Sequence, residues 1–205
     1  MSRSEFLKAS PPMFQSSLLD RFSRVHPAIP VAIYVPTIAV LFATGGQRLG
    51  LLTALGLALG GYAVWTLTEY WLHRIVFHFE PERGLGARLH WMIHGVHHDH
   101  PNDPMRLVMP PSASIPLALI FYGLFWFAMG PDRATAFAAG FLAGYLAYDM
   151  VHYAVHHHQP RTVAGRRLRE LHMRHHFQDE ERGFGVSAPY WDRVFGTASR
   201  PRTGG

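Results

Sequence analysis

The chain has 205 residues, a formal net charge of +5 and a mean hydropathy of +0.02. It contains no cysteine, which excludes disulfides, thiolate metal sites and thiol nucleophiles. No nucleic-acid-binding motif accompanies the positive charge, so we expect no nucleic-acid partner. The mean hydropathy conceals a strong contrast along the chain, because the apolar residues collect in a few long runs.

Four apolar segments approach the roughly 20 residues that a helix needs to cross a bilayer. They lie near residues 28–45, 50–72, 112–130 and 134–155. The turn-like sequences Gly45-Gly46-Gln47-Arg48 and Gly130-Pro131-Asp132-Arg133 separate them into two expected helical hairpins. We therefore predict an all-α, multi-pass integral membrane protein. Residues 28–205 would form one membrane-embedded domain, and residues 1–27 an N-terminal segment without the apolar stretch of a cleavable signal peptide.

The distribution of basic residues predicts the orientation in the membrane. Four Lys or Arg residues precede the first span, four lie in 73–111 and nine follow residue 155, against one in each short hairpin loop. The positive-inside bias then places both termini, the loop 73–111 and the region 156–205 on the cytoplasmic side. The arginines between Arg161 and Arg174 fit either a helix facing lipid headgroups or a surface for an acidic electron-donor protein, and the sequence leaves both open.

Histidine is the most informative residue type, because fourteen of the fifteen histidines lie between His73 and His176. Residues three or four apart share a helix face, so triplets of the form HxxHH and a pair of the form HxxxH would each direct their imidazoles one way. A spacing of five does not align on a regular helix, so we expect His73 at the end of the second span and His78 beyond it, where the backbone can turn. Ten histidines form these groups: His73 and His78; His94, His97 and His98; His152 and His156; His172, His175 and His176.

These histidines predict a metal site, since both regions that carry them emerge from the same ends of the four spans. Ten imidazoles suit two ions such as iron or zinc. A dinuclear centre with open positions can bind and reduce dioxygen, so the metal centre rather than a catalytic side chain would carry the chemistry. The absence of HExxH disfavours a zinc peptidase.

Two acids in the apolar spans are predicted to support the ligands. Glu69, four residues before His73, and Asp149, three residues before His152, would accept the second ring N–H of those histidines. A membrane haem or electron-transfer protein and a metal transporter are the alternatives from other classes. Both would place metal-binding groups within the spans rather than at their ends. The histidines kept outside the ligand set are His26, His90, His100, His157 and His158.

At these residues the chain resembles the fatty acid hydroxylase superfamily, most closely its fatty acid 2-hydroxylase branch. The resemblance covers roughly residues 65–197. It rests on HRIVFHF, on HGVHHDHPND followed by RLVMPP, on YDMVHYAVHH, and on HMRHHF with the trailing GFGVSAPYWDRVFGT, in that order.

The resemblance implies a four-helix membrane bundle with a cytosolic helical cap and a dimetal site held by all ten histidines. It also implies hydroxylation of a long-chain fatty acid or lipid acyl chain, at C2, with O2 and an external reductant. Iron is favoured for activity, and zinc is possible in the same positions. A sterol- or carotenoid-type hydroxylase or desaturase of the same superfamily is the alternative.

Longer relatives begin with a cytochrome b5-like haem domain, whose HPGG motif is absent here. We therefore expect a separate electron-donor protein of the cytochrome b5, ferredoxin or reductase type.

Overall fold

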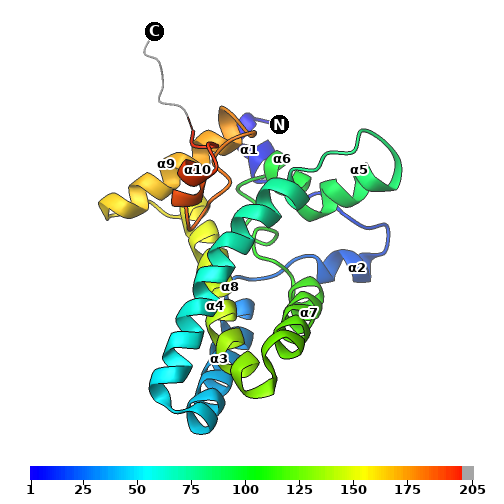
Figure 1. The fold of residues 1–205 in the computed structure, drawn as a ribbon. Coiled ribbons are helices and arrows are strands. Elements are labelled where there is room, and N and C mark those ends of the chain that lie inside the picture. The colour runs from blue at the N-terminus through cyan, green and yellow to red at the C-terminus, as the bar shows by residue number, and fades with distance from the viewer. Residues whose placement is uncertain (200–205) are drawn as a thin grey trace. The chain divides into compact units, whose positions relative to one another are not determined.

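The computed structural model describes residues 1–199, and this part of the chain consists of helices and connecting loops, with no β-strand (Figure 1). Four helices are long and apolar enough to cross a membrane, as predicted: α3 (Ala28–Leu49), α4 (Leu51–Trp71), α7 (Pro111–Met129) and α8 (Pro131–His157). Helix α4 continues directly into a π-helix, η1 (Leu72–Phe77). The remaining helices are α1 (Arg3–Leu7), α2 (Ser17–Phe22), α5 (Gly84–His90), the π-helix η2 (Trp91–Gly95), α6 (Val96–Asp99), α9 (Val163–Phe177) and α10 (Tyr190–Val194).

The two connections between long helices are each a single glycine. Helix α3 runs through Gly45–Arg48 to Leu49, so the four-residue turn predicted there is wrong, and the chain reverses at Gly50 with φ 83°. Helix α8 already begins at Pro131, which leaves only Gly130, with φ 81°, between α7 and α8. A positive φ suits glycine because no Cβ clashes with the backbone. Pro131, which follows Gly130, has a ring that fixes φ near the value of the first helical turn.

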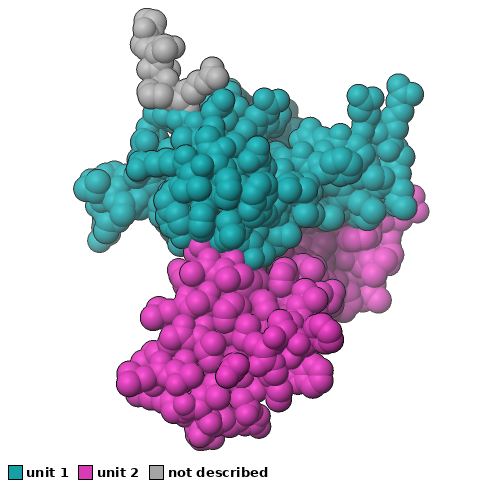
Figure 2. Space-filling model, in the orientation of Figure 1, with its two compact units in different colours: residues 1–9, 67–103, 151–205 teal, residues 10–66, 104–150 magenta. Residues whose placement is uncertain are grey.

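The contacts divide the chain into two compact units (Figure 2). Unit 1 comprises residues 1–9, 67–103 and 151 onward, and unit 2 comprises residues 10–66 and 104–150. In unit 2 many large apolar side chains are exposed, among them Leu52 at 85% and Phe127 at 88%. Such a surface is unfavourable in water and suits the hydrocarbon of a bilayer. Together with the four long apolar helices, it identifies an integral membrane protein.

Small residues allow α4 and α8 to pack closely in unit 2. A Cβ added at Gly140 of α8 would lie 1.7 Å from the Ala58 carbonyl oxygen, and one at Gly144 would lie 2.7 Å from the Cβ of Trp65. The Trp65 ring meets Phe141 edge-on at 5.1 Å between centroids. Small residues four apart let helix backbones approach and gain dispersion contacts where no hydrophobic effect operates. Both helices then continue into unit 1, where η1, which follows α4, and the end of α8 carry histidines.

The core of unit 1 is built mainly from imidazole rings. His73, His172 and His175 are each at most 2% exposed, as is Tyr70, three residues before His73. Buried polar groups are costly unless they find partners. The arrangement of these rings therefore decides what unit 1 does.

Candidate metal centre

All ten predicted histidines fall into two groups in unit 1. Within each group one ring nitrogen from every residue lies within 4.8 Å of the corresponding nitrogens of the others. Four chain segments contribute: η1 with the residue after it, η2 with α6, the end of α8, and α9. The first histidine group is His73, His78, His94, His98 and His175, and the second histidine group is His97, His152, His156, His172 and His176.

The π-helix η1 explains the spacing of five between His73 and His78. The His78 N–H donates to the His73 carbonyl at 3.2 Å, a bond across five residues rather than four. A π-turn brings residues five apart onto one face, and the two rings are 5.0 Å apart. His73 lies near the end of the second apolar helix and His78 is the first residue beyond η1, as expected. The spacing alone did not predict the π-helix. The helix widens by one residue and keeps both rings together.

The two HxxHH triplets are each divided between the groups. His94 and His98 belong to the first group and His97 to the second, whereas His175 belongs to the first and His172 and His176 to the second. Around a helix, the side chain four residues after a given one is rotated by about 40°, so these two side chains enter the same group. The side chain three residues after it is rotated by about 60° in the opposite direction and enters the other group. Each triplet thus joins the two groups, and the rings of His98 and His176 stack at 4.3 Å.

The distances between ring nitrogens are close to those around a shared metal ion. Nitrogens that each lie about 2.1 Å from one ion stand about 3.0–3.4 Å apart at octahedral to tetrahedral angles. In the first group the Nε2–Nε2 distances are 3.2 Å for His73–His94, 3.3 Å for His73–His78, 3.0 Å for His78–His175 and 2.9 Å for His94–His98. In the second they are 3.0 Å for His97–His152, 2.9 Å for His97–His176, 2.8 Å for His156–His172 and 3.1 Å for His172–His176.

Backbone carbonyls determine where the protons sit on two of these rings. His73 donates its Nδ1–H to the Phe184 carbonyl at 2.6 Å, and His175 donates its Nδ1–H to the Arg182 carbonyl at 2.8 Å. Since a carbonyl only accepts, each Nε2 presents a lone pair to the first group. Lone pairs that converge in this way repel each other unless a cation lies between them. The donor set therefore fits a metal ion, and a bond from the other ring nitrogen is the usual support of a metal-binding histidine.

The predicted role of Glu69 as the partner of His73 is wrong, because Phe184 occupies that nitrogen. Glu69 instead accepts from the Ser187 N–H at 2.7 Å and from the Ser187 hydroxyl. Asp149 accepts from the Met109 N–H at 3.3 Å and the Tyr145 hydroxyl at 3.4 Å. Its support of His152 stays a prediction.

The segment 183–197 is held by one buried carboxylate. Asp192 accepts from the N–H groups of Phe184 and Gly185, each at 2.9 Å, and from the Thr197 hydroxyl at 2.8 Å. The Thr197 hydroxyl also lies 2.9 Å from that of Tyr70. These bonds fix the Phe184 carbonyl, and through it the His73 ring.

In the sequence, this segment stands out only through the family resemblance, and nothing there indicates the roles of Arg182, Phe184 and Asp192. The first two act through backbone carbonyls, which carry no side-chain signature.

The seven histidines of the two groups that lie outside the membrane spans are neutral over a wide pH range. Burial removes their charged form from water, and neighbouring imidazoles add repulsion for most of them, so their pKa values fall below the usual 6.5. The pKa is lowered to about 3 for His78, about 2 for His98 and about 4 for His175. It is also lowered well below 6.5 for His94, His97, His172 and His176. Neutral imidazole is the form that binds a metal.

The five histidines kept outside the predicted ligand set belong to neither group. His90 donates to the Phe77 carbonyl and His100 to the Phe6 carbonyl, both at 2.7 Å. His26 accepts from the Ala28 N–H at 3.2 Å. His158 is exposed.

Several known proteins are similar to this chain. The model of the family described as fatty acid hydroxylase matches residues 58–197. A dihydroceramide fatty acyl 2-hydroxylase of Arabidopsis thaliana is 37% identical over 82% of this chain and 69% of its own length. The ceramide very long chain fatty acid hydroxylase of Saccharomyces cerevisiae is 36% identical over 95% of this chain and 51% of its own length.

A solved structure of full-length Scs7p, in which only the hydroxylase domain is visible, superposes with a TM-score of 0.89 at 36% identity, over 96% of this chain and 75% of that one. The chain, with its four apolar helices and two histidine groups, belongs to the fatty acid hydroxylase family.

Proposed function

We propose that this protein hydroxylates a long-chain fatty acyl group at C2, using two metal ions held by the ten histidines, O2 and an external reductant. The observation that carries the proposal is the division of ten imidazoles into two sets of five nitrogens, each set within 4.8 Å. A haem would need two axial nitrogens separated by the porphyrin plane and would leave the other imidazoles of each set without a role. The predicted haem-protein alternative is therefore not favoured.

Iron in both positions would supply the redox chemistry that activates O2, which zinc lacks. Overall, one oxygen atom enters the C–H bond, and the other is reduced to water by two electrons and two protons. The chain's own residues hold the Nε2 lone pairs in place and keep water away, since seven of the ten histidines are at most 7% exposed. No side chain other than the metal ligands is assigned a catalytic role.

The acyl substrate is supported by the relatives, which are named as fatty acyl or ceramide fatty acid hydroxylases. A free fatty acid and an acyl chain in a membrane lipid both fit an enzyme with long lipid-facing helices. The sterol- and carotenoid-type alternatives gain no support from these relatives.

We further propose that unit 1 is the cytosolic cap and that both termini are cytoplasmic. The support is the count of basic residues, which are frequent in 73–111 and after 155 and single in each short loop. The reducing equivalents would then come from a separate cytosolic or membrane-bound electron-donor protein.

The test expresses the chain in a host that makes no 2-hydroxy lipids and analyses the lipids by mass spectrometry. The wild type should produce 2-hydroxy acyl chains, and purified protein should hold about two metal ions per chain. His97→Ala and His175→Ala each remove one nitrogen from one group and should abolish the product, whereas His158→Ala, an exposed histidine outside both groups, should not. A normal amount of product from His97→Ala or from His175→Ala would show that the replaced histidine is not an essential ligand.

A further inference from the structure

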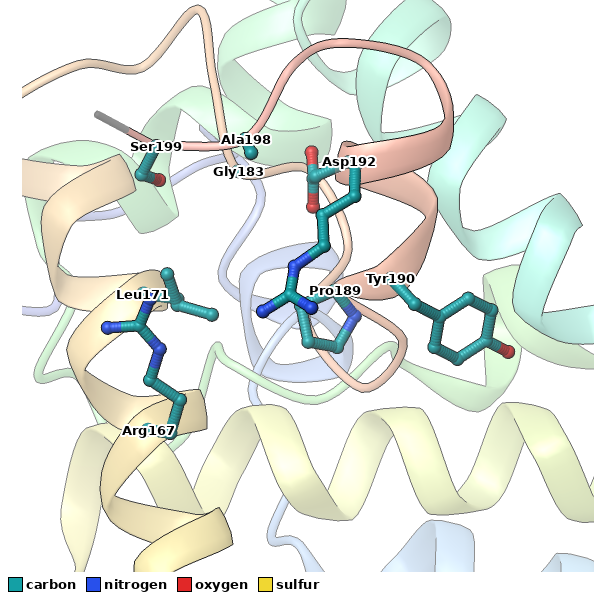
Figure 3. Close-up of a pocket in the computed structure, with 9 residues that line it drawn as sticks. Arg167, Leu171, Gly183, Pro189, Tyr190, Asp192, Ala198 and Ser199 are labelled. Carbon is teal, nitrogen blue, oxygen red and sulfur yellow. The ribbon is translucent and has the colours of Figure 1, made fainter. Parts of the chain in front are cut away.

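A cavity of about 210 Å³ lies in unit 1 between α9 and the segment that contains α10 (Figure 3). We call it the α9–α10 cavity. Arg167 and Leu171 of α9 lie on one side of it, and Pro189 and Asp192 lie on the other (Figure 3). Gly183 and Ser199 also line it. Arg193 also lines the cavity. None of these residues is a predicted metal ligand, and the proposed hydroxylation does not use the cavity.

The cavity offers positive charge and hydrogen-bond donors without matching acceptors. The Arg193 guanidinium makes no ion pair and no side-chain hydrogen bond with any residue in 1–199. Arg167 pairs with Glu170 at 2.9 Å, but both side chains are about half exposed, so this pair is weak. The buried Ser199 hydroxyl has no partner among the described residues.

The one acid that lines the cavity is already engaged. Asp192 accepts from the N–H groups of Phe184 and Gly185 and from the Thr197 hydroxyl. Its oxygens face those donors, and Asp192 forms no ion pair with Arg167 or Arg193. Two guanidinium groups that face one small cavity without a free carboxylate favour an anion between them. Arginine binds phosphate oxygens through paired N–H donors, and a serine hydroxyl adds another.

We propose that the α9–α10 cavity binds a phosphate-type oxyanion. The bound anion would join α9, through Arg167, to Arg193 of α10. The cavity wall also contains Gly183, which lies between Arg182 and Phe184, the residues whose carbonyls hold the rings of His175 and His73. An anion in the cavity would therefore stabilise the segment that orients two metal ligands. A lipid headgroup and free phosphate present the same chemistry.

The test measures binding of radiolabelled inorganic phosphate to the purified full-length protein in a neutral detergent by equilibrium dialysis. The wild type should bind saturably, and Arg193→Gln should weaken binding about tenfold or more, because a charge-assisted contact is lost. The matched control is Arg166→Gln, an exposed arginine of α9 that does not line the cavity, and it should bind as the wild type does. Thermal unfolding of each variant confirms that it is folded.

A short-chain phosphatidic acid, followed by displacement of the label and by thermal shift, distinguishes the two sources. If phosphatidic acid displaces the label at a much lower concentration than unlabelled phosphate does, the cavity is assigned to a lipid headgroup. If both compounds displace it at the same concentration, the cavity is assigned to free phosphate. The proposal is overturned if neither compound binds. It is also overturned if Arg193→Gln binds like the wild type, or if Arg166→Gln weakens binding equally, since the effect would then be one of general charge.

Discussion

The buried carboxylate of Asp192 provides a sharp test of how the metal centre is held. In Asp192→Asn the remaining side-chain oxygen can still accept from the Phe184 N–H and the Thr197 hydroxyl. The new amide nitrogen takes the place of Oδ2, which accepts from the Gly185 N–H at 2.9 Å in the wild type. The variant loses one charge-assisted hydrogen bond and leaves two donors facing each other in a buried site. Each effect costs about 1.5–3 kcal/mol, so we expect a loss of about 3 kcal/mol or more in the free energy of unfolding.

This loss should appear in both stability and metal retention. For a chain of this size, 1 kcal/mol corresponds to about 2–4 °C in Tm, so the melting temperature should fall by about 6–12 °C. Because Asp192 fixes the carbonyl that orients His73, metal affinity should fall about 10–100-fold. Intrinsic tryptophan fluorescence during heating measures the first, and competition with a coloured chelator measures the second.

The control is Asp132→Asn, the same change at an exposed acid that pairs with Arg48 at 2.7 Å. Surface pairs contribute about 0–1 kcal/mol, so its Tm should change by at most a few degrees. If Asp192→Asn kept the melting temperature and metal affinity of the wild type, the carboxylate would not be what holds the segment 183–197 in place.

Three further predictions concern helix packing, histidine protonation and the metal. Gly140→Ala places a Cβ against the Ala58 carbonyl and should lower the free energy of unfolding in detergent by about 1–3 kcal/mol. The control Gly123→Ala adds a Cβ with no atom within 4 Å and should be neutral or stabilising; equal effects of the two variants would contradict close packing of α4 and α8. Metal-free protein should lose stability as the pH falls from 6.5 towards 4. The pKa values of His78, His98 and His175 are lower in the folded chain than in the unfolded chain, so over this range the unfolded chain binds more protons. Each such histidine contributes about 1.4 kcal/mol per pH unit, and a flat profile of Tm against pH would refute this. Removal of metal by a chelator should lower Tm, and iron and zinc should both restore it while only iron restores hydroxylation; recovery of activity with zinc alone would exclude a redox role for the metal.

Much of the fold follows from local composition. The long apolar runs predict the four membrane helices within a few residues, because the bilayer thickness sets their length regardless of their neighbours. The connections were less predictable. Gly45-Gly46 reads as a turn in isolation, yet α3 continues to Leu49 and the chain reverses at Gly50, since packing of the helix outweighs the weak local preference of two glycines.

The sequence alone also identified all ten histidines of the two groups, because they recur at short, mostly helical spacings in four motifs. Only the tertiary structure shows which histidine belongs to which group. The widening of η1 aligns His73 with His78, and the rotation between residues three and four apart divides each HxxHH triplet.

The partners of the second ring nitrogens likewise depend on the tertiary structure. A carboxylate one turn away in sequence suggested Glu69 for His73, but the Phe184 carbonyl, 111 residues away, occupies that position. Side-chain chemistry can be read from residue types, whereas a backbone carbonyl is the same in every residue and acquires a role only from where the folded chain places it.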